Sequence, residues 1–371
     1  MKFKIKQNIL MNHLNYVIRG VSNKNLIPIL NCIKFELNKD GLYLISTDNE
    51  ISIKTFISSN NINEIDSCGE VLVSGKFIYD IIKKLPGEII DLEEVMDSKL
   101  YITTSKSSFT LNCNEVNEFP NLKFDEIDKP ISINNVLFKN MINETIFAAS
   151  TQESRPALTG INIKIKNGKL ECTATDSFRL SKKIVEIDSN NEYDIIIPTR
   201  SLNELIKILD DNDEILEMHI FENKVLFKSN NIMMMSSLIN GTYPDTSKLI
   251  PNNFETIIKV KLSDYYNAID RASLLTNELD KNTIMFESNK NEVIISSNIP
   301  EIGNVKEIVN IENKSKKEIS IAFSSKYMLD AIRTFESDEI ELCFNGEVKP
   351  IILRNVDDNN LIQLIVPIRT Y

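Results

Sequence analysis

The chain has 371 residues, of which 42% are hydrophobic and 26% are charged, a composition typical of a globular protein with two or three domains. Five cysteines without a CxxC pair and only two histidines argue against a structural zinc site, and a net charge of −11 argues against a general affinity for nucleic acid. No apolar run approaches the ~20 residues that span a bilayer, so we expect a cytoplasmic protein without a membrane partner.

The first elements in chain order are a strand, a helix and a series of alternating strands. The opening residues, "MKFKIK", alternate lysine with apolar residues and predict a strand, and residues 8–20 predict a helix. A proline-marked strand follows at "NLIPIL", and "GLYLISTDNEISIKTFI" then alternates apolar and polar residues. A period of two is typical of half-buried strands in an antiparallel sheet.

The next segment, "KFIYDIIKKL" at residues 76–85, recurs twice further along the chain. It aligns without gaps with "RSLNELIKIL" at 200–209 and "KYMLDAIRTF" at 326–335. A base, an acid and a second base hold the same places in all three copies. The apolar residues follow the i, i+3, i+4, i+7 spacing of a helix with one buried stripe. Helices are therefore predicted at 75–85, 199–209 and 325–335.

The elements before this helix recur as well. Predicted helices at 136–150 and 262–275 correspond to the one at 8–20, and alternating strands follow each of them. Thr47-Asp48 and Thr175-Asp176 hold equivalent places, so Asp176 is predicted to be a turn residue. The chain is predicted to be three tandem copies of one α+β domain, each with two helices and an antiparallel sheet. Their predicted limits, set by polar stretches with prolines, are 1–123, 130–251 and 254–371.

Residues that would indicate an enzyme are not found in a recognisable arrangement. The ten glycines form neither GxGxxG nor a P-loop, so no cofactor is expected. His13 and His219 are predicted to be structural, which leaves no base for a catalytic triad. The acidic clusters "DLEEVMD" and "DDNDE" are predicted to be solvated turns and not metal sites. A nuclease that uses "DLEEVMD" with magnesium, and a scaffold that binds only proteins, remain as alternatives.

The charge is distributed unequally between the predicted helices and the rest of the chain. The six helices carry ten Lys and Arg against six Asp and Glu, although the whole chain carries −11. If all six helices face one surface, that surface is basic and suits contact with a phosphate backbone without sequence preference. The alternative is that these are ordinary lysine-rich helix surfaces.

The three repeats, together with "SRPALTG", "ATDSFRLS", "YPDTSKLIP" and "LIVPIRTY", closely resemble the bacterial DNA sliding clamp, the beta subunit of DNA polymerase III. The resemblance covers the whole chain. It implies a head-to-tail homodimeric ring of six domains, with helices lining a pore around duplex DNA. It also implies a non-catalytic processivity factor. Such a factor binds the polymerase III catalytic subunit, the clamp loader, other polymerases and repair proteins through short linear motifs.

The resemblance further implies a hydrophobic pocket between the second and third domains, into which partners insert a peptide. Carried over by motif, its residues are Leu158, Thr175, Ser177, Phe178, Arg179, Leu180, Pro244, Lys248, Leu249, Tyr327, Leu364, Val366, Pro367, Ile368 and Arg369. Arg179 is expected either to support the turn or to hydrogen-bond the ligand backbone. Phe178 stands where many members have histidine, Lys248 where many have arginine, and the tail continues to Thr370-Tyr371. These departures bear on which peptides bind.

Contacts to DNA and to a second copy are implied in the same way. The DNA contacts carried over are Lys24, Gln152, Arg155 and Arg200. Many members have tyrosines where Pro156 and Ala157 stand, so stacking from this loop is not expected. The residues carried over for the joint between copies are Phe109 and Leu111 on one face, and Leu274 and Leu275 on the other.

Overall fold

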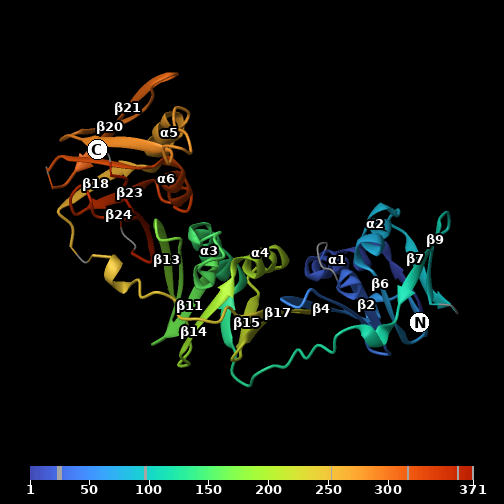
Figure 1. The fold of residues 1–371 in the computed structure, drawn as a ribbon. Coiled ribbons are helices and arrows are strands. Elements are labelled where there is room, and N and C mark those ends of the chain that lie inside the picture. The colour runs from blue at the N-terminus through green and yellow to red at the C-terminus, as the bar shows by residue number, and fades with distance from the viewer. Residues whose placement is uncertain (23–26, 96–97, 252, 316, 357–358, 370–371) are drawn as a thin grey trace. The chain divides into compact units, whose positions relative to one another are not determined.

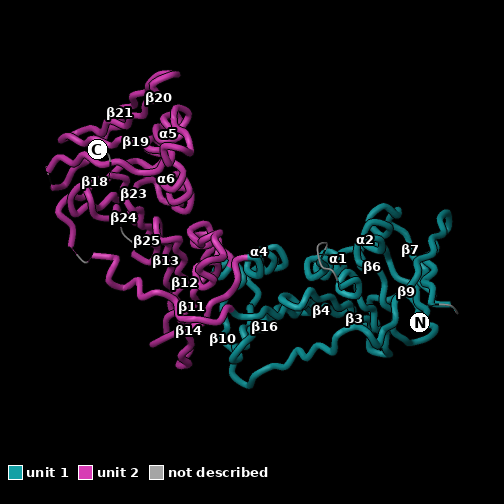
Figure 2. Tube along the Cα trace, viewed as in Figure 1, with its two compact units in different colours: residues 1–138, 200–238 teal, residues 139–199, 239–371 magenta. Residues whose placement is uncertain are grey.

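The computed structural model describes residues 1–22, 27–95, 98–251, 253–315, 317–356 and 359–369. The chain divides into two compact units (Figure 2): residues 1–138 with 200–238 form unit 1, and residues 139–199 with 239–371 form unit 2. Within the described residues, no helix is both long and apolar enough to cross a bilayer. All six predicted helices are present, each within a few residues of its predicted limits.

Unit 1 is built on one antiparallel sheet with helices α1 (Gln7–Val17) and α2 (Gly75–Lys84) packed together against it (Figure 1). From edge to edge, the thirteen strands are β10 (Ile131–Asn134), β15 (Ile215–Ile220), β16 (Lys224–Ser229), β17 (Ile232–Ser237), β4 (Ile51–Ser58), β3 (Gly41–Thr47), β2 (Cys32–Leu37), β6 (Gly69–Ser74), β9 (Ser108–Asn114), β8 (Lys99–Thr103), β7 (Ile89–Val95), β1 (Lys2–Lys6) and β5 (Glu64–Ser67).

Unit 2 has a second antiparallel sheet, against which α5 (Leu262–Ser273) and α6 (Ser325–Ile332) lie side by side (Figure 1). From edge to edge, its twelve strands are β14 (Tyr193–Pro198), β11 (Gly160–Lys166), β12 (Lys169–Thr175), β13 (Arg179–Glu186), β25 (Leu361–Ile365), β24 (Ile351–Asn355), β23 (Glu339–Phe344), β18 (Thr256–Lys261), β21 (Gly303–Asn313), β20 (Glu292–Ile299), β19 (Thr283–Ser288) and β22 (Ile319–Ser324).

The division into units falls within α3 (Asn135–Thr145) and at the start of α4 (Thr199–Ile208). The middle repeat therefore supplies strands to both sheets. It joins the first repeat where β17 pairs with β4, and the third repeat where β13 pairs with β25. In each junction, the third strand after a repeat's first helix pairs with the last strand of the following repeat.

The helices form because one stripe of each is apolar and becomes buried. In α2, Ile78 and Ile82 are fully buried, while Phe77 on the other face is 58% exposed. Positions four residues apart lie on the same face of an α-helix, which is why the spacing read from the sequence predicts the buried side. Residues three apart also share a face, and Leu202 and Leu205 of α4 are buried in this way.

Candidate functional site

A groove with a volume of about 670 Å³ opens on unit 2. The lining residues that the sequence predicted are Phe178, Tyr327, Val366, Pro367, Ile368 and Arg369. The lining residues that it did not predict are Glu278, Lys281, Asn282, Ser324 and Lys326. The groove therefore has an apolar floor, contributed mainly by the tail, and a charged rim.

One side of the groove is the tight turn between β12 and β13. The Thr175 hydroxyl donates to the carbonyl of Arg179 at 2.6 Å and accepts from the amide of Ser177 at 3.2 Å. Asp176 Oδ1 accepts from the amides of Phe178 and Arg179, both at 2.9 Å. These bonds hold Ser177 at a φ of 78°, a conformation uncommon for residues other than glycine. The turn therefore presents Phe178 outward, where its side chain is 57% exposed.

The equivalent turn of the first repeat has the same construction. Thr47 Oγ1 donates to the carbonyl of Ile51 at 3.1 Å, Asp48 Oδ1 accepts two amides, and Asn49 has a φ of 78°. Asp176 thus holds a turn together, as Asp48 does in its own repeat. The role is that of an Asx turn, in which a carboxylate replaces a backbone acceptor.

The Arg179 side chain links this turn to α6. Its Nε lies 3.0 Å from Asp176 Oδ2, and its Nη1 lies 2.7 Å from Asp330 Oδ2 on α6. The guanidinium also lies 4.5 Å from the ring centre of Tyr327 and 5.3 Å from that of Phe147. Burial raises the pKa of Tyr327, and nearby Asp176 raises it further, while Arg179 lowers it. Of the two roles expected for Arg179, the geometry favours support of the turn.

The tail, which supplies most of the apolar floor, has its backbone fixed on both sides of Pro367. The amide of Val366 donates to the carbonyl of Phe178 at 2.8 Å, and the amide of Ile368 donates to that of Ala322 at 2.7 Å. Proline restricts its own φ and favours an extended residue before it, so the tail stays extended between these two bonds.

The other predicted pocket residues are three buried leucines and three residues of an exposed segment. Leu158, Leu180 and Leu364 are only 5%, 1% and 3% exposed, so they pack beneath the surface. Pro244, Lys248 and Leu249 are exposed, in the segment before β18. None of these six is among the residues that line the groove.

The unpredicted rim comes from the loop between α5 and β19 and from the start of α6. Lys281 and Asn282 have φ of 53° and 55°. The Asn282 carbonyl accepts from the amide of Ser325 at 2.8 Å and from its hydroxyl at 3.1 Å. Tyr327 was the only residue of this region that a motif indicated. The polar loop "TNELDKN" carries no periodicity that would place it beside the tail.

The predicted DNA contacts differ in their surroundings. Lys24 lies outside the described residues. Gln152 and Arg155 are exposed, and Arg155 Nη1 donates to the Ser177 hydroxyl at 3.3 Å. Arg200 forms ion pairs with the carboxylates of Asp48 and Glu50. The Arg200 guanidinium thus links α4 to the turn between β3 and β4, which competes with a phosphate contact.

The residues predicted for the joint between copies lie on partly open strand edges or beside them. Phe109 is 39% exposed on β9, which pairs with β6 only at Cys113 and Asn114. Leu274, at the end of α5, is 78% exposed. Strand β21 pairs with β20 over residues 303–310 but with β18 only over 311–313. Within the described residues, each of these two strands has a stretch with one free edge.

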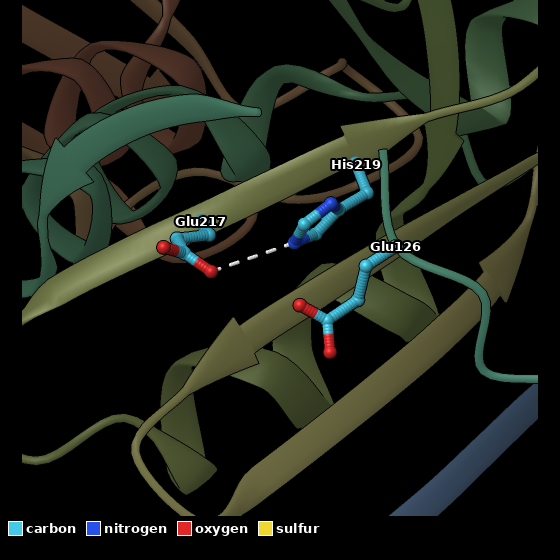
Figure 3. Close-up of side chains that lie close together, drawn as sticks. All are labelled: Glu126, Glu217 and His219. Carbon is cyan, nitrogen blue, oxygen red and sulfur yellow. Dashed lines mark ion pairs between the residues drawn. The ribbon is translucent and has the colours of Figure 1, made fainter. Parts of the chain in front are cut away.

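His219 lies in a cluster that resembles a metal site (Figure 3). The ligand atoms of Glu126, Glu217 and His219 lie within 4.8 Å of one another. However, His219 Nδ1 accepts a hydrogen bond of 3.0 Å from the amide of Ile127, so the neutral ring carries its proton on Nε2. That nitrogen, 3.5 Å from Glu217 Oε2, then has no lone pair for a cation. The cluster instead holds the segment before β10 on the sheet.

The segment "DLEEVMD" was predicted to be a solvated turn, but its described residues lie on a strand. Asp91, Glu93 and Glu94 belong to β7, where successive side chains point to opposite faces. Glu93 Oε2 lies 3.3 Å from Lys2 Nζ. Asp97 lies outside the described residues.

Comparisons with known proteins agree over the whole chain. Family profiles for the N-terminal, central and C-terminal domains of the DNA polymerase III beta subunit match residues 1–123, 132–245 and 247–369. The chain is 40% identical over 378 residues to the beta sliding clamp of Bacillus subtilis, and 40% identical over 376 residues to that of Staphylococcus epidermidis, with both chains fully covered in each case.

Solved structures show the same similarity. The crystal structure of the DNA polymerase sliding clamp from Bacillus subtilis matches with a TM-score of 0.96 at 39% identity, and 100% of each chain is covered. That of the DNA polymerase III beta chain from Streptococcus pneumoniae matches with a TM-score of 0.95 at 33% identity, again with full coverage. The predicted α+β fold of three tandem clamp domains is confirmed. The chain belongs to the family of the DNA polymerase III beta subunit, the bacterial sliding clamps.

Proposed function

We propose that two copies of this chain close head to tail into a six-domain ring around duplex DNA, and that the groove on unit 2 binds peptides from replication and repair proteins. As a family member, the chain is a non-catalytic processivity subunit of DNA polymerase III. The domain limits proposed are 1–123, 130–251 and 254–371, and the proposed location is the cytoplasm.

The observation that carries the ring is the repeated rule of strand pairing. The third strand after a repeat's first helix pairs with the last strand of the next repeat, as β4 does with β17 and β13 with β25. β21 is the third strand after the first helix of the third repeat, so by this rule it should pair with the last strand of a following repeat. The chain has no fourth repeat to supply that strand. The equivalent strand with a free edge is β9 of the first repeat, which would come from a second copy. A heterologous contact of this kind gives a closed ring when the rotation that relates one copy to the next returns to the first copy.

Apolar side chains at these two strands support the same joint. Phe109 and Leu111 lie on β9, and Leu274 and Leu275 follow α5, which packs against β21. Ile308 on β21 is 58% exposed. Exposed apolar residues beside a free strand edge are costly in a monomer and are covered by strand addition.

The groove suits a peptide with a few apolar anchors. Its volume of about 670 Å³ and its floor of Phe178, Tyr327, Val366, Pro367 and Ile368 match the usual form of a peptide anchor site. The partners proposed are the polymerase III catalytic subunit, the clamp loader, other polymerases and repair proteins. For DNA, the proposed contacts are those at Lys24, Gln152, Arg155 and Arg200.

Topological retention on DNA tests the proposal. The clamp, loaded by its cognate loader onto a singly nicked plasmid, should stay with the circle during gel filtration and should be lost when a restriction enzyme cuts the circle. Retention that survives cutting would indicate ordinary DNA binding, and no retention at all would indicate a scaffold that binds only proteins.

A further inference from the structure

The chain that joins the first two repeats is fastened to the sheet of unit 1 by side chains of β15 and β16. Residues 123–127, called here the linker segment, carry two of the carboxylates involved. Asp125 Oδ2 lies 3.9 Å from Lys224 Nζ, and Glu126 Oε2 lies 2.6 Å from Lys228 Nζ. The two lysine side chains are 28% and 31% exposed, so these ion pairs are partly screened by water and hold the segment only weakly.

One contact of the linker segment is buried. The Ile127 amide donates to Nδ1 of His219 at 3.0 Å, and His219 is only 1% exposed. Leu226, which lies opposite His219 on β16, is buried to the same extent. A buried amide that loses its acceptor has no water to replace it, which makes the loss costly. The docking of the linker segment therefore depends most on the lone pair of His219 Nδ1.

A proton and the Ile127 amide compete for this lone pair. Neutral imidazole has one acceptor nitrogen, and the protonated ring has none. Two carboxylates face the ring: Glu217 from its own strand, 3.5 Å from Nε2, and Glu126 from the linker segment (Figure 3). Both also lie near Lys228 Nζ, at 3.8 and 2.6 Å, which offsets their attraction for a charged ring. Protonation of His219 thus removes the acceptor without an equal gain elsewhere.

We propose that protonation of His219 releases the linker segment, so that this fastening between the first two repeats opens more readily in mild acid than at neutral pH. An ordinary histidine is mostly neutral at pH 7.5 and about 90% protonated at pH 5.5. Because the docked segment occupies the lone pair, only the released state takes up the proton. The population of the released state should therefore rise about tenfold between these two pH values. Release uncovers the buried face around Leu226.

Hydrogen–deuterium exchange of the full-length clamp measures the release. A His13→Gln background leaves His219 as the only histidine, so that acid acts through no other imidazole. After correction for the intrinsic pH dependence of exchange, the Ile127 amide should lose about tenfold of its protection between pH 7.5 and 5.5. The amides of β20, in unit 2, should keep theirs. Nuclear magnetic resonance with isotope-labelled histidine should show the ring protonated only on Nε2 at pH 7.5.

A pair of substitutions assigns the response to His219. His219→Asn keeps an acceptor oxygen near the place of Nδ1 but cannot be protonated, so the Ile127 amide should stay protected at both pH values. His219→Leu removes the acceptor, and protection should be low at both. Unchanged or higher protection at pH 5.5 with His219 in place would overturn the inference, because the two carboxylates would then hold the charged ring and the segment together. An acid-dependent loss of protection that persists in His219→Asn would overturn it as well, as would a ring that carries its proton on Nδ1 at pH 7.5.

Discussion

Arg179 and Asp330 join the turn that bears Phe178 to the last helix of the chain, with Nη1 and Oδ2 only 2.7 Å apart. Their side chains are 12% and 26% exposed, so water screens this pair less than a surface pair. The tail is bonded to this turn, where the Val366 amide donates to the carbonyl of Phe178, and to β22 just before the helix, where the Ile368 amide donates to the carbonyl of Ala322. The shape of the groove therefore depends on a charge that does not line it.

Removing the Arg179 charge should weaken both the fold and peptide binding. Arg179→Met removes the guanidinium that joins Asp176 to Asp330, and we expect a loss of roughly 2–4 kcal/mol in the stability of unit 2. Peptide affinity should fall by about tenfold. Calorimetric unfolding and fluorescence anisotropy measure the two effects. Arg333→Met, which removes a more exposed arginine 3.7 Å from Asp330, is the control and should change both values little.

Breaking the proposed joint should give folded monomers. Leu274→Ala with Leu275→Lys removes apolar area and adds a charge where a second copy would pack. Sedimentation equilibrium should then report a mass of 42.4 kDa in place of twice that value. Leu279→Lys, at a residue 98% exposed in the following loop, should remain a dimer. An unchanged dimer in the double variant would remove Leu274 and Leu275 from the joint.

Phosphate contacts predict weak, salt-sensitive and sequence-blind binding to open duplex DNA. Substituting Lys24, Arg155 and Arg200 by Ala should reduce loading on circular DNA without changing the dimer. The three single variants distinguish a loss of DNA binding from a loss of stability. Arg200→Ala also removes the ion pairs with Asp48 and Glu50 and so affects the fold. If Arg200 acts only between elements of unit 1, its single variant should lower the melting temperature and leave the salt dependence of DNA binding unchanged.

Deleting residues 367–371 should abolish peptide binding while leaving the ring intact. The deletion removes Pro367 and Ile368 from the groove and the hydrogen bond to Ala322, but keeps β25 and its pairing with β13. Isothermal calorimetry on a confirmed dimer measures the loss. Peptide affinity that persists after the deletion would place the binding site elsewhere.

Acid should destabilise unit 1 through His13. Burial lowers the pKa of His13 to about 4 from an ordinary 6.5, and its Nδ1 lies 2.6 Å from Thr55 Oγ1. The unfolded chain therefore binds a proton below pH 6.5 that the folded chain takes up only near pH 4. The free energy of unfolding should consequently decrease as the pH is lowered from 6.5 to 4. We expect a loss of about 2–3 kcal/mol by pH 4. His13→Gln should flatten this part of the profile in urea titrations between pH 4 and 7.

The sequence by itself determined the repeat, the six helices, the alternating strands and the Thr175-Asp176 turn. Each of these depends on spacing within a few residues, as the matching turns at Asn49 and Ser177 show. Motif resemblance then indicated the tail and Tyr327 as parts of one site.

Only the tertiary structure decided which side chains meet across the groove. The loop that carries Lys281 and the tail are held at the same segment, because the Asn282 carbonyl accepts the amide of Ser325 and the Ala322 carbonyl accepts the amide of Ile368. These contacts leave no periodic trace in the sequence. Likewise, the charge of Arg200 was evident, but its pairing with Asp48 depends on how α4 meets the turn of another repeat. Hydrophobic spacing specifies which face of an element is buried, whereas the partner of a polar side chain is set by the packing of elements distant in the chain.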